Sequence, residues 1–342
     1  MGPERPWRRR TPAEITSPCV DDSPWLQGRG PSPARASSGL RKVIMTSLPY
    51  RPLLRRWRPA AFTAVAAAGL LTLSGCGADA TSSAAGEESA HETGHGDLPS
   101  AHVHGVAVNP ADELVYLATH DGLFRYDDGE PTRVGPVIDL MGFTVAGPDH
   151  FYASGHPGPG VDLPEPVGLI ESTNGGESWE LRSRQGESDF HALTASSAGV
   201  VGFDGRELTT TVDGTSWREL GAGVTPHALA ASGDGSVLVA TNESGLMRSV
   251  DGGTTWAPVA GAPLLQVVDW AEDQTVVGVS PNGTVAVSTD AGATWDERAR
   301  VSGSPEAVGA SASAEGTLRI LVVAGGGLHD SADGGETFVP LP

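Results

Sequence analysis

Residues 77–342 contain no lysine. Their 10 basic residues are all arginine and are outnumbered by 38 Asp and Glu. The chain also has only two cysteines, Cys19 and Cys76, and both precede this acidic part. Its strong negative charge would repel a phosphate backbone, which excludes nucleic acid as a partner. The positions of the cysteines exclude a disulfide and a cysteine-based metal site within residues 77–342.

Aromatic residues are also scarce, at 6% of the 342 residues, whereas glycine and proline occur 46 and 26 times. Hydrophobic residues make up 39% of the chain, which is enough for a sizeable core built around many turns. This composition argues against a helical bundle. Residues 1–76 differ from the rest, because they carry 12 Lys and Arg against 4 Asp and Glu.

Residues 45–76 have the layout of an export signal. Four arginines between residues 51 and 58 precede an apolar run over residues 59–73, which is too short for a comfortable transmembrane helix. The run ends in Leu73-Ser-Gly-Cys76, which resembles the lipobox of bacterial lipoproteins. This resemblance implies that Cys76 becomes the lipid-modified first residue of the mature chain.

These signals divide the chain into four expected segments. Residues 1–44 precede a methionine that itself starts a well-formed signal, so we interpret them as upstream of the true start or as disordered. Residues 45–75 are the expected lipoprotein signal peptide, residues 76–100 the lipidated cysteine and a flexible tether, and residues 101–342 the folded domain. The expected location is the outer face of the bacterial cell membrane, with the protein exported and held by its lipid.

Five segments of the acidic part share one spacing of small, acidic and aromatic residues. Ser-x-Asp-x-Gly-x-x-aromatic is complete at Asp251, Asp290 and Asp333, whereas the copy at Asp213 is one residue short and another has Asn174 in place of Asp. In a tight hairpin, the Asp oxygen can accept backbone N–H bonds, glycine takes a positive φ, and the ring packs under the turn. We therefore interpret these residues as structural.

The pattern resembles the Asp box, or BNR repeat, of the sialidase-like β-propellers, over about residues 101–342. In that family the box lies away from the active site. The strand before each box is expected to begin at residue 123, 169, 208, 246, 285 or 328, and each repeat holds four strand-like runs. Six repeats predict an all-β, six-bladed β-propeller of four-stranded blades with Asp-box hairpins, and a seven-bladed ring is the alternative.

Differences between the repeats mark a candidate site at one mouth of the central channel. Antiparallel strands bring the start of the first strand and the end of the second to the same edge of a blade. The first strands begin with His, Asp, Met or Glu, the second strands end in His or Asp, and the long insertion at residues 157–167 leaves the same edge as an expected cover. The boxes are expected at the opposite mouth.

Imidazole, thioether and carboxylate groups gathered in one place suit a transition metal, with histidine typical of copper or zinc and methionine of copper(I). We therefore predict a metal or small polar ligand at this mouth. The alternative for any single histidine is a ring wedged between blades and bonded to a carbonyl. The candidate ligands are His102, His104, His120, Met141, His156, His191 and His227.

Two further function classes stay open, and with them the question of whether the protein is an enzyme. A glycoside hydrolase of the sialidase-like group needs two carboxylates beside a sugar, and the candidates are Asp139, Asp189, Asp204 and Glu306. The arginine triad and the Tyr–Glu nucleophile pair that the resemblance implies for a sialidase are not seen in the sequence. The third class is a non-catalytic scaffold for protein partners. The expected partners are the membrane, through the lipid, and a small polar ligand, metal or glycan.

Overall fold

We analysed a computed structural model of the chain, which describes residues 98–341 except residues 128, 222 and 314–315. These residues form 24 strands in six four-stranded antiparallel sheets that follow one another in sequence order. The predicted six-bladed β-propeller is therefore confirmed, and the seven-bladed alternative is wrong for the described residues. Cys76 and the expected signal peptide lie outside them. Among the described residues, no helix is long and apolar enough to cross a membrane.

Each of the first three blades is a continuous segment of chain. Blade 1 consists of β1 (Val103–Val108), β2 (Val115–Thr119), β3 (Gly122–Asp127) and β4 (Glu130–Val134). Blade 2 consists of β5 (Ile138–Gly147), β6 (His150–Pro157), β7 (Leu169–Ser172) and β8 (Glu180–Ser183). Blade 3 consists of β9 (Ala192–Ser196), β10 (Gly199–Phe203), β11 (Leu208–Thr211) and β12 (Trp217–Glu219).

The last three blades repeat this arrangement. Blade 4 consists of β13 (Ala228–Ala231), β14 (Leu238–Asn242), β15 (Gly245–Ser249) and β16 (Ala257–Pro258). Blade 5 consists of β17 (Val267–Trp270), β18 (Val276–Val279), β19 (Thr284–Ser288) and β20 (Asp296–Arg300). Blade 6 consists of β21 (Pro305–Ala312), β22 (Leu318–Ala324), β23 (Gly327–Ser331) and β24 (Val339–Leu341).

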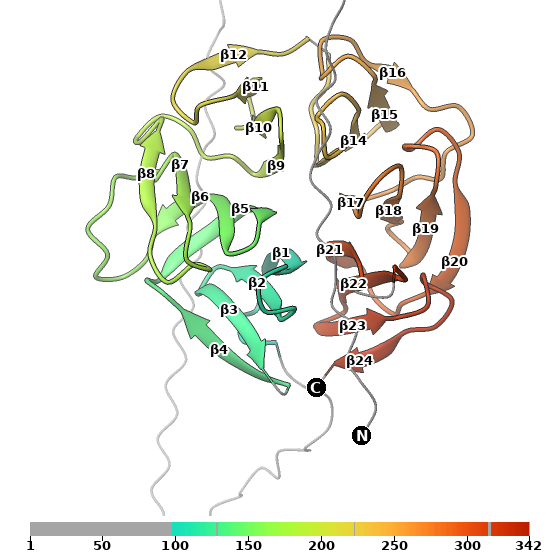
Figure 1. Cartoon of the computed structure of the whole chain (residues 1–342), viewed down its shortest axis with the longest axis horizontal. Coiled ribbons are helices and arrows are strands. Elements are labelled where there is room, and N and C mark those ends of the chain that lie inside the picture. Colours follow the sequence, from blue (N-terminus) through green and yellow to red (C-terminus); the bar gives the residue numbers. More distant parts are fainter. Residues whose placement is uncertain (1–97, 128, 222, 314–315, 342) are drawn as a thin grey trace, which may run out of the picture. The chain divides into compact units, whose positions relative to one another are not determined.

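The first strand of every blade is the innermost one. β1, β5, β9, β13, β17 and β21 each contact the first strands of the two neighbouring blades, which closes a ring around the centre (Figure 1). Within a blade the remaining three strands follow outward in order. Blade 6 and blade 1 each have four strands from their own segment of the chain. The ring therefore closes by packing of blade 6 against blade 1, and no strand is exchanged between them.

The hydrophobic core is divided among the six interfaces between blades. Six clusters of buried side chains each combine residues of two neighbouring blades, because a four-stranded sheet has two faces to bury and finds a partner on either side. The cluster that closes the ring joins Leu117 of blade 1 to Leu321 of blade 6. Leu98 also packs against it, so the chain joins blade 1 slightly before residue 101.

The hairpins between the third and fourth strands of blades 2–6, which we call the box hairpins, share one set of hydrogen bonds. In blade 4, Ser249 Oγ donates to Asp251 Oδ1 at 2.8 Å, and the same oxygen accepts the N–H of Thr255 at 2.8 Å. Trp256 Nε1 closes the turn by donating to the Gly253 carbonyl at 3.0 Å. Equivalent bonds to the side-chain oxygen recur at Asn174, Asp213, Asp290 and Asp333.

Two adjacent glycines of the blade 4 box hairpin both have a positive φ, but only one of them is closely packed. Substitutions at the two positions therefore distinguish the effect of backbone strain from the effect of crowding. Gly252 and Gly253 have φ values of +65° and +83°. A Cβ on Gly253 would lie 2.8 Å from Leu220 and 2.9 Å from Leu238, whereas one on Gly252 meets nothing closer than 3.5 Å. We expect Gly252→Ala to lower the free energy of unfolding by about 1 kcal/mol and Gly253→Ala by about 1–3 kcal/mol more. Equal losses in urea unfolding would contradict the role given to packing.

Candidate metal centre

A central channel with a volume of about 530 Å³ runs between the first strands of the blades. At one mouth its lining includes His104, Met141, His191, His227 and Glu306, each from the first four residues of a first strand or the residue just before it. Toward the other end it includes Pro110, Trp270 and Ser311, which lie at or beyond the ends of their strands. The channel therefore joins the histidine-rich edge of the ring to the opposite edge.

A shift in strand register lies at three of these mouth positions. The register of β1 with β2 shifts between Val103 and Gly105, so His104 is an extra residue with no partner of its own, and Met141 in β5 and Glu306 in β21 stand at the same kind of shift. Such a bulge re-aims the side chain that it carries. In blades 3–5 the equivalent N–H groups donate to the ends of the second strands, His191 to Phe203, His227 to Thr241 and Gln266 to Val279.

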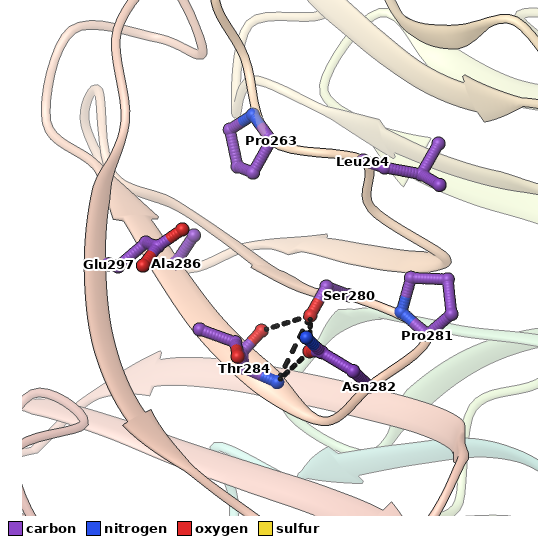
Figure 2. A pocket seen from close by; sticks show the side chains of 8 residues that line it. All are labelled: Pro263, Leu264, Ser280, Pro281, Asn282, Thr284, Ala286 and Glu297. Carbon is purple, nitrogen blue, oxygen red and sulfur yellow. Dashed lines mark hydrogen bonds between the residues drawn. The ribbon is translucent and has the colours of Figure 1, made fainter.

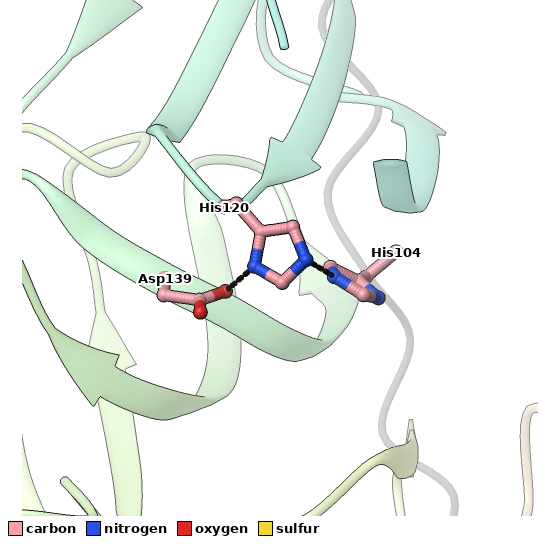
Figure 3. Close-up of side chains that lie close together, drawn as sticks. All are labelled: His104, His120 and Asp139. Atoms are coloured by element: carbon pink, nitrogen blue, oxygen red, sulfur yellow. Dashed lines mark hydrogen bonds and ion pairs between the residues drawn. The ribbon is translucent and has the colours of Figure 1, made fainter. Parts of the chain in front are cut away.

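His104, His120 and Asp139 form the first cluster at this mouth. Figure 3 shows His120, which follows β2 directly, between His104 of β1 and Asp139 of β5. The Nε2 atoms of His104 and His120 are 3.3 Å apart, and His120 Nδ1 lies 2.8 Å from Asp139 Oδ1. Candidate ligand atoms of all three residues lie within 4.8 Å of one another. The ring of His102 stands edge-on to His120, with the centroids 5.3 Å apart.

The electrostatics of this cluster favour a neutral His104 and a nearby cation. Burial lowers the pKa of His104, the neighbouring His120 lowers it further, and Asp139 opposes both. A neutral imidazole is the form that binds a metal. Asp139 Oδ1 is buried and lacks a hydrogen bond of good geometry even though His120 Nδ1 is close.

The second cluster is a chain of four side chains, Glu165–His156–Asp189–His191, which we call the Asp189 relay. Asp189 Oδ2 contacts Nε2 of His191 at 2.6 Å and Nε2 of His156 at 3.0 Å. Glu165 Oε1 holds the other nitrogen of His156 at 2.8 Å. The relay adjoins the first cluster, because Asp139 and His156 are paired across β5 and β6.

Glu165 was missed by the sequence reasoning as a site residue. It belongs to the insertion at residues 157–167, which has no counterpart in the other repeats. Comparison between repeats therefore gave no signal for it, and only the expectation that the insertion covers this mouth pointed toward it.

The charges of the relay shift two pKa values in opposite directions. The hydrogen bond to Asp189 raises the pKa of His191, and burial opposes this only in part. Burial alone would raise the pKa of Asp189, but the hydrogen bond and charge of His191, together with His156, lower it. A pair with these shifts is most stable when both partners are ionised.

We expect this pair to give the protein a pH-dependent increment of stability. The raised pKa of His191 contributes below its ordinary value of 6.5 and is lost as pH rises through the folded-state value. The lowered pKa of Asp189 contributes above 3.8 and is lost as pH falls below it. Asp189→Asn should therefore lower the free energy of unfolding more near pH 5 than at pH 8. Because His191 is exposed, we expect the loss near pH 5 to be about 1 kcal/mol or less. Urea unfolding at both pH values measures this, and a loss that is equal at both contradicts it.

The remaining candidates lie outside both clusters. Asp204 Oδ1 accepts the N–H groups of Arg206 and Glu207 at 3.1 and 3.0 Å, so this carboxylate caps the turn after β10. Glu306 Oε2 accepts the N–H of Val103 at 3.2 Å and thereby joins blade 6 to blade 1. Met141 and His227 line the channel without belonging to either cluster.

Comparison with known proteins supports the fold. No family model matches the chain, and no curated protein matches it either. A chain of a nidogen–laminin complex is similar with a TM-score of 0.52 and 13% identity, over 66% of this chain and 91% of that one. The shared feature is the β-propeller. At such low identity the similarity extends to the fold alone.

Two other solved structures are similar over a comparable part of this chain. An ancestral GH74 enzyme has a TM-score of 0.47 and 13% identity, over 68% of this chain and 36% of its own, so the present chain spans about a third of that enzyme. YCF48 bound to a D1 peptide has a TM-score of 0.45 and 17% identity, over 71% of this chain and 83% of its own.

Two of the four carboxylates proposed for glycoside hydrolysis, Asp189 and Asp204, show the wrong acidity for a general acid. Such a group needs a raised pKa. The pKa of Asp204 is lowered: burial would raise it, but the hydrogen bonds from Glu207, Ser188 and Arg206 prevail. The pKa of Asp189 is lowered as well. Neither residue is therefore suited to protonate a leaving group.

The sequence suggested no glutamate partner for any tyrosine, but the structure contains such a pair. Tyr152 of β6 pairs with Glu171 of β7, and burial followed by this hydrogen bond raises the pKa of Tyr152 to about 12. Glu171 also contacts His150 Nε2 at 2.6 Å and Arg182 Nε at 3.2 Å. None of the four is among the described residues that line the channel, and a single arginine is present where a sialidase uses three.

A second hollow, of about 380 Å³, lies in blade 5 (Figure 2). Hydrogen bonds among Ser280, Asn282 and Thr284 shape its floor, and Glu297 is the one ionisable residue in its lining. This hollow lacks a cluster of groups that could hold a metal or transfer a proton. The candidate site is therefore the histidine-rich mouth of the channel.

Proposed function

We propose that the channel mouth binds one transition-metal ion, zinc or copper(II), through His104 and His120 with Asp139 beside them. The separation of 3.3 Å between the two Nε2 atoms carries this proposal. In a tetrahedral site with Zn–N bonds of 2.0–2.1 Å, two nitrogen ligands stand about 3.3–3.4 Å apart. The two rings are perpendicular, and their Nε2 atoms approach each other at the spacing that a shared ion requires.

Asp139 supports the site from the far side of His120. With Oδ1 next to Nδ1, the carboxylate favours the tautomer that leaves Nε2 free for the metal, as carboxylates commonly do behind metal-binding histidines. Its negative charge also offsets part of the charge of the ion. His102 is a further imidazole beside His120, and a coordination position stays open for water or a small ligand.

The donor set favours zinc or copper(II) over copper(I). Imidazole and carboxylate suit the first two ions, whereas a thioether favours copper(I). Met141, the thioether that the sequence placed among the candidates, lines the channel outside the cluster. We therefore do not include Met141 among the ligands.

Calorimetric titration of the purified protein, first dialysed against a chelator, tests the proposal. We expect binding of one Zn²⁺ or one Cu²⁺ per chain. The absence of binding heat with both ions overturns the proposal, and the contact between His104 and His120 is then a hydrogen bond between two neutral rings.

We also propose that the chain is an Asp-box propeller that carries this site outside the cell, anchored through a lipid on Cys76. The shared hydrogen bonds of the five box hairpins support the first part, and the lipobox-like Leu73-Ser-Gly-Cys76 supports the second. We expect Cys76→Ser to move the protein from the membrane fraction to the soluble fraction in its native host. A Cys76→Ser protein that stays in the membrane fraction contradicts lipid anchoring.

A further inference from the structure

The Asp189 relay leaves one edge of His191 available at the channel mouth. His191 Nε2 is held by Asp189, whereas His191 Nδ1 has no hydrogen-bond partner among the described residues. The side chain of His191 is 57% exposed, and that of Asp189 is only 17% exposed. Two imidazole rings, those of His156 and His191, thus hold Oδ2 of the carboxylate, and the free edge of His191 is offered to a ligand.

His191 lies at the same mouth of the channel as the proposed metal site. Both His191 and His104 line the channel, and the charge of His191 lowers the pKa of His104, after the larger effects of burial, His120 and Asp139. The hydrogen bond to Asp189 raises the pKa of His191, which favours the form with a proton on both nitrogens. Two positive groups, an ion and an imidazolium, would then face the same opening.

The first strands of the blades form the wall of the channel below this opening, and side chains such as Val106, Leu229 and Val308 belong to the buried clusters between the blades. The channel lining contains the carboxyl groups of Asp269 and Glu306, and residues 77–342 as a whole are strongly acidic. These negative groups repel an anion of more than one charge more strongly than a monoanion. The lining therefore suits a compact molecule that carries a single negative charge.

We infer, on the basis of the metal site proposed above, that the mouth binds the carboxylate of a small organic acid. One carboxylate oxygen coordinates the ion held by His104 and His120, and the other accepts a hydrogen bond from His191 Nδ1. The body of the acid lies in the channel. The ligand class of the protein is then a small monocarboxylic acid, recognised jointly by a metal and a histidine.

The experiment uses the protein loaded with Co²⁺, whose visible absorption reports the ligands of the ion. Benzoate is the probe, benzamide is its uncharged counterpart, and inorganic phosphate is the anion of higher charge. We expect a saturable spectral change with benzoate, none with benzamide, and binding of phosphate at least ten-fold weaker than that of benzoate. Benzamide or phosphate acting as well as benzoate overturns the inference.

Substitution of His191 separates this inference from the metal site. His191→Ala should leave Co²⁺ binding within two-fold of the wild type and weaken benzoate binding ten-fold or more. His329→Ala, on β23 outside both clusters and the channel lining, is the matched control and should change neither. If His191→Ala binds benzoate within two-fold of the wild type, the inference is wrong and the metal site stands. If wild-type protein does not bind Co²⁺, both proposals fail.

Discussion

Replacement of both His104 and His120 by alanine should abolish zinc and copper(II) binding in calorimetric titration. The variant loses both nitrogens that face each other at 3.3 Å and leaves Asp139 as the only residue of the cluster. A single carboxylate does not hold a transition metal against water at micromolar concentration. Because His104 and His120 are only partly buried, the variant should keep its thermal unfolding midpoint within a few degrees of the wild type.

Two further variants show whether the loss belongs to this cluster. His227→Ala combined with His329→Ala also removes two histidines, both outside the cluster, and should bind zinc within two-fold of the wild type. Asp139→Asn keeps the two ligands and removes the charge behind His120, so we expect a loss of about 10–100-fold in affinity. Retained binding in the His104/His120 variant, or lost binding in the control, places the metal elsewhere.

The number and type of blades could be predicted from the sequence because each box hairpin is stabilised locally. Residues such as Ser249, Asp251 and Trp256 make their bonds within one turn of the chain, so the same spacing recurs wherever the turn recurs. Counting the five boxes then counts the third and fourth strands of blades 2–6, and the strand-like runs before the first box add blade 1. The antiparallel order of the strands also indicated which strand ends share an edge, and this placed His104 and His120 near each other.

The division of the candidate residues into two clusters could not be predicted in this way. The alternation of side chains along a regular strand does not predict the register shift at His104, and this shift changes the direction of its side chain. Alignment of the repeats places Asp204 at the position of His120 and His156, but short bonds to the backbone of the next turn hold Asp204 instead. Hydrogen-bond geometry decides whether a carboxylate binds the backbone of its own turn or another side chain, and residue spacing alone does not define this geometry.

The pairing of Tyr152 with Glu171 was missed for a different reason. The two residues are direct neighbours across β6 and β7, so an uninterrupted hairpin would have revealed them through its register. The insertion at residues 157–167 separates these strands and hides that register in the sequence. The same insertion contributes Glu165 to the relay.

Asp269 was also missed, because it lies in the interior of β17 and not at the strand start where the repeats were compared. Its Oδ2 accepts the N–H of Ala310 in the next blade at 2.8 Å, and its side chain lines the channel. Burial raises the pKa of Asp269 from 3.8 to about 7, although backbone hydrogen bonds oppose this shift. The residue therefore carries an unfavourable charge in the folded protein at neutral and alkaline pH.

Asp269→Asn should accordingly stabilise the protein at pH 8 and change little at pH 4. Between pH 3.8 and about 7 the folded protein binds more protons than the unfolded chain, so the wild type loses stability as pH rises through this range. Asparagine keeps an acceptor oxygen for Ala310 and removes the charge. Since Asp269 keeps part of its surface open to the channel, we expect a gain of about 1–3 kcal/mol, less than the full pKa shift implies.

Urea unfolding of wild type and variant at both pH values measures this gain, and Asp204→Asn provides a control of opposite sign. Burial would raise the pKa of Asp204, but hydrogen bonds from Glu207, Ser188 and Arg206 outweigh burial and lower it. Loss of this charge should therefore destabilise the protein at pH 8. A carboxylate that caps a turn and one that faces the channel thus respond oppositely to the same substitution. If Asp269→Asn is less stable than the wild type at pH 8, the carboxylate is ionised and favourably solvated in the channel, and the acidity assigned to it is wrong.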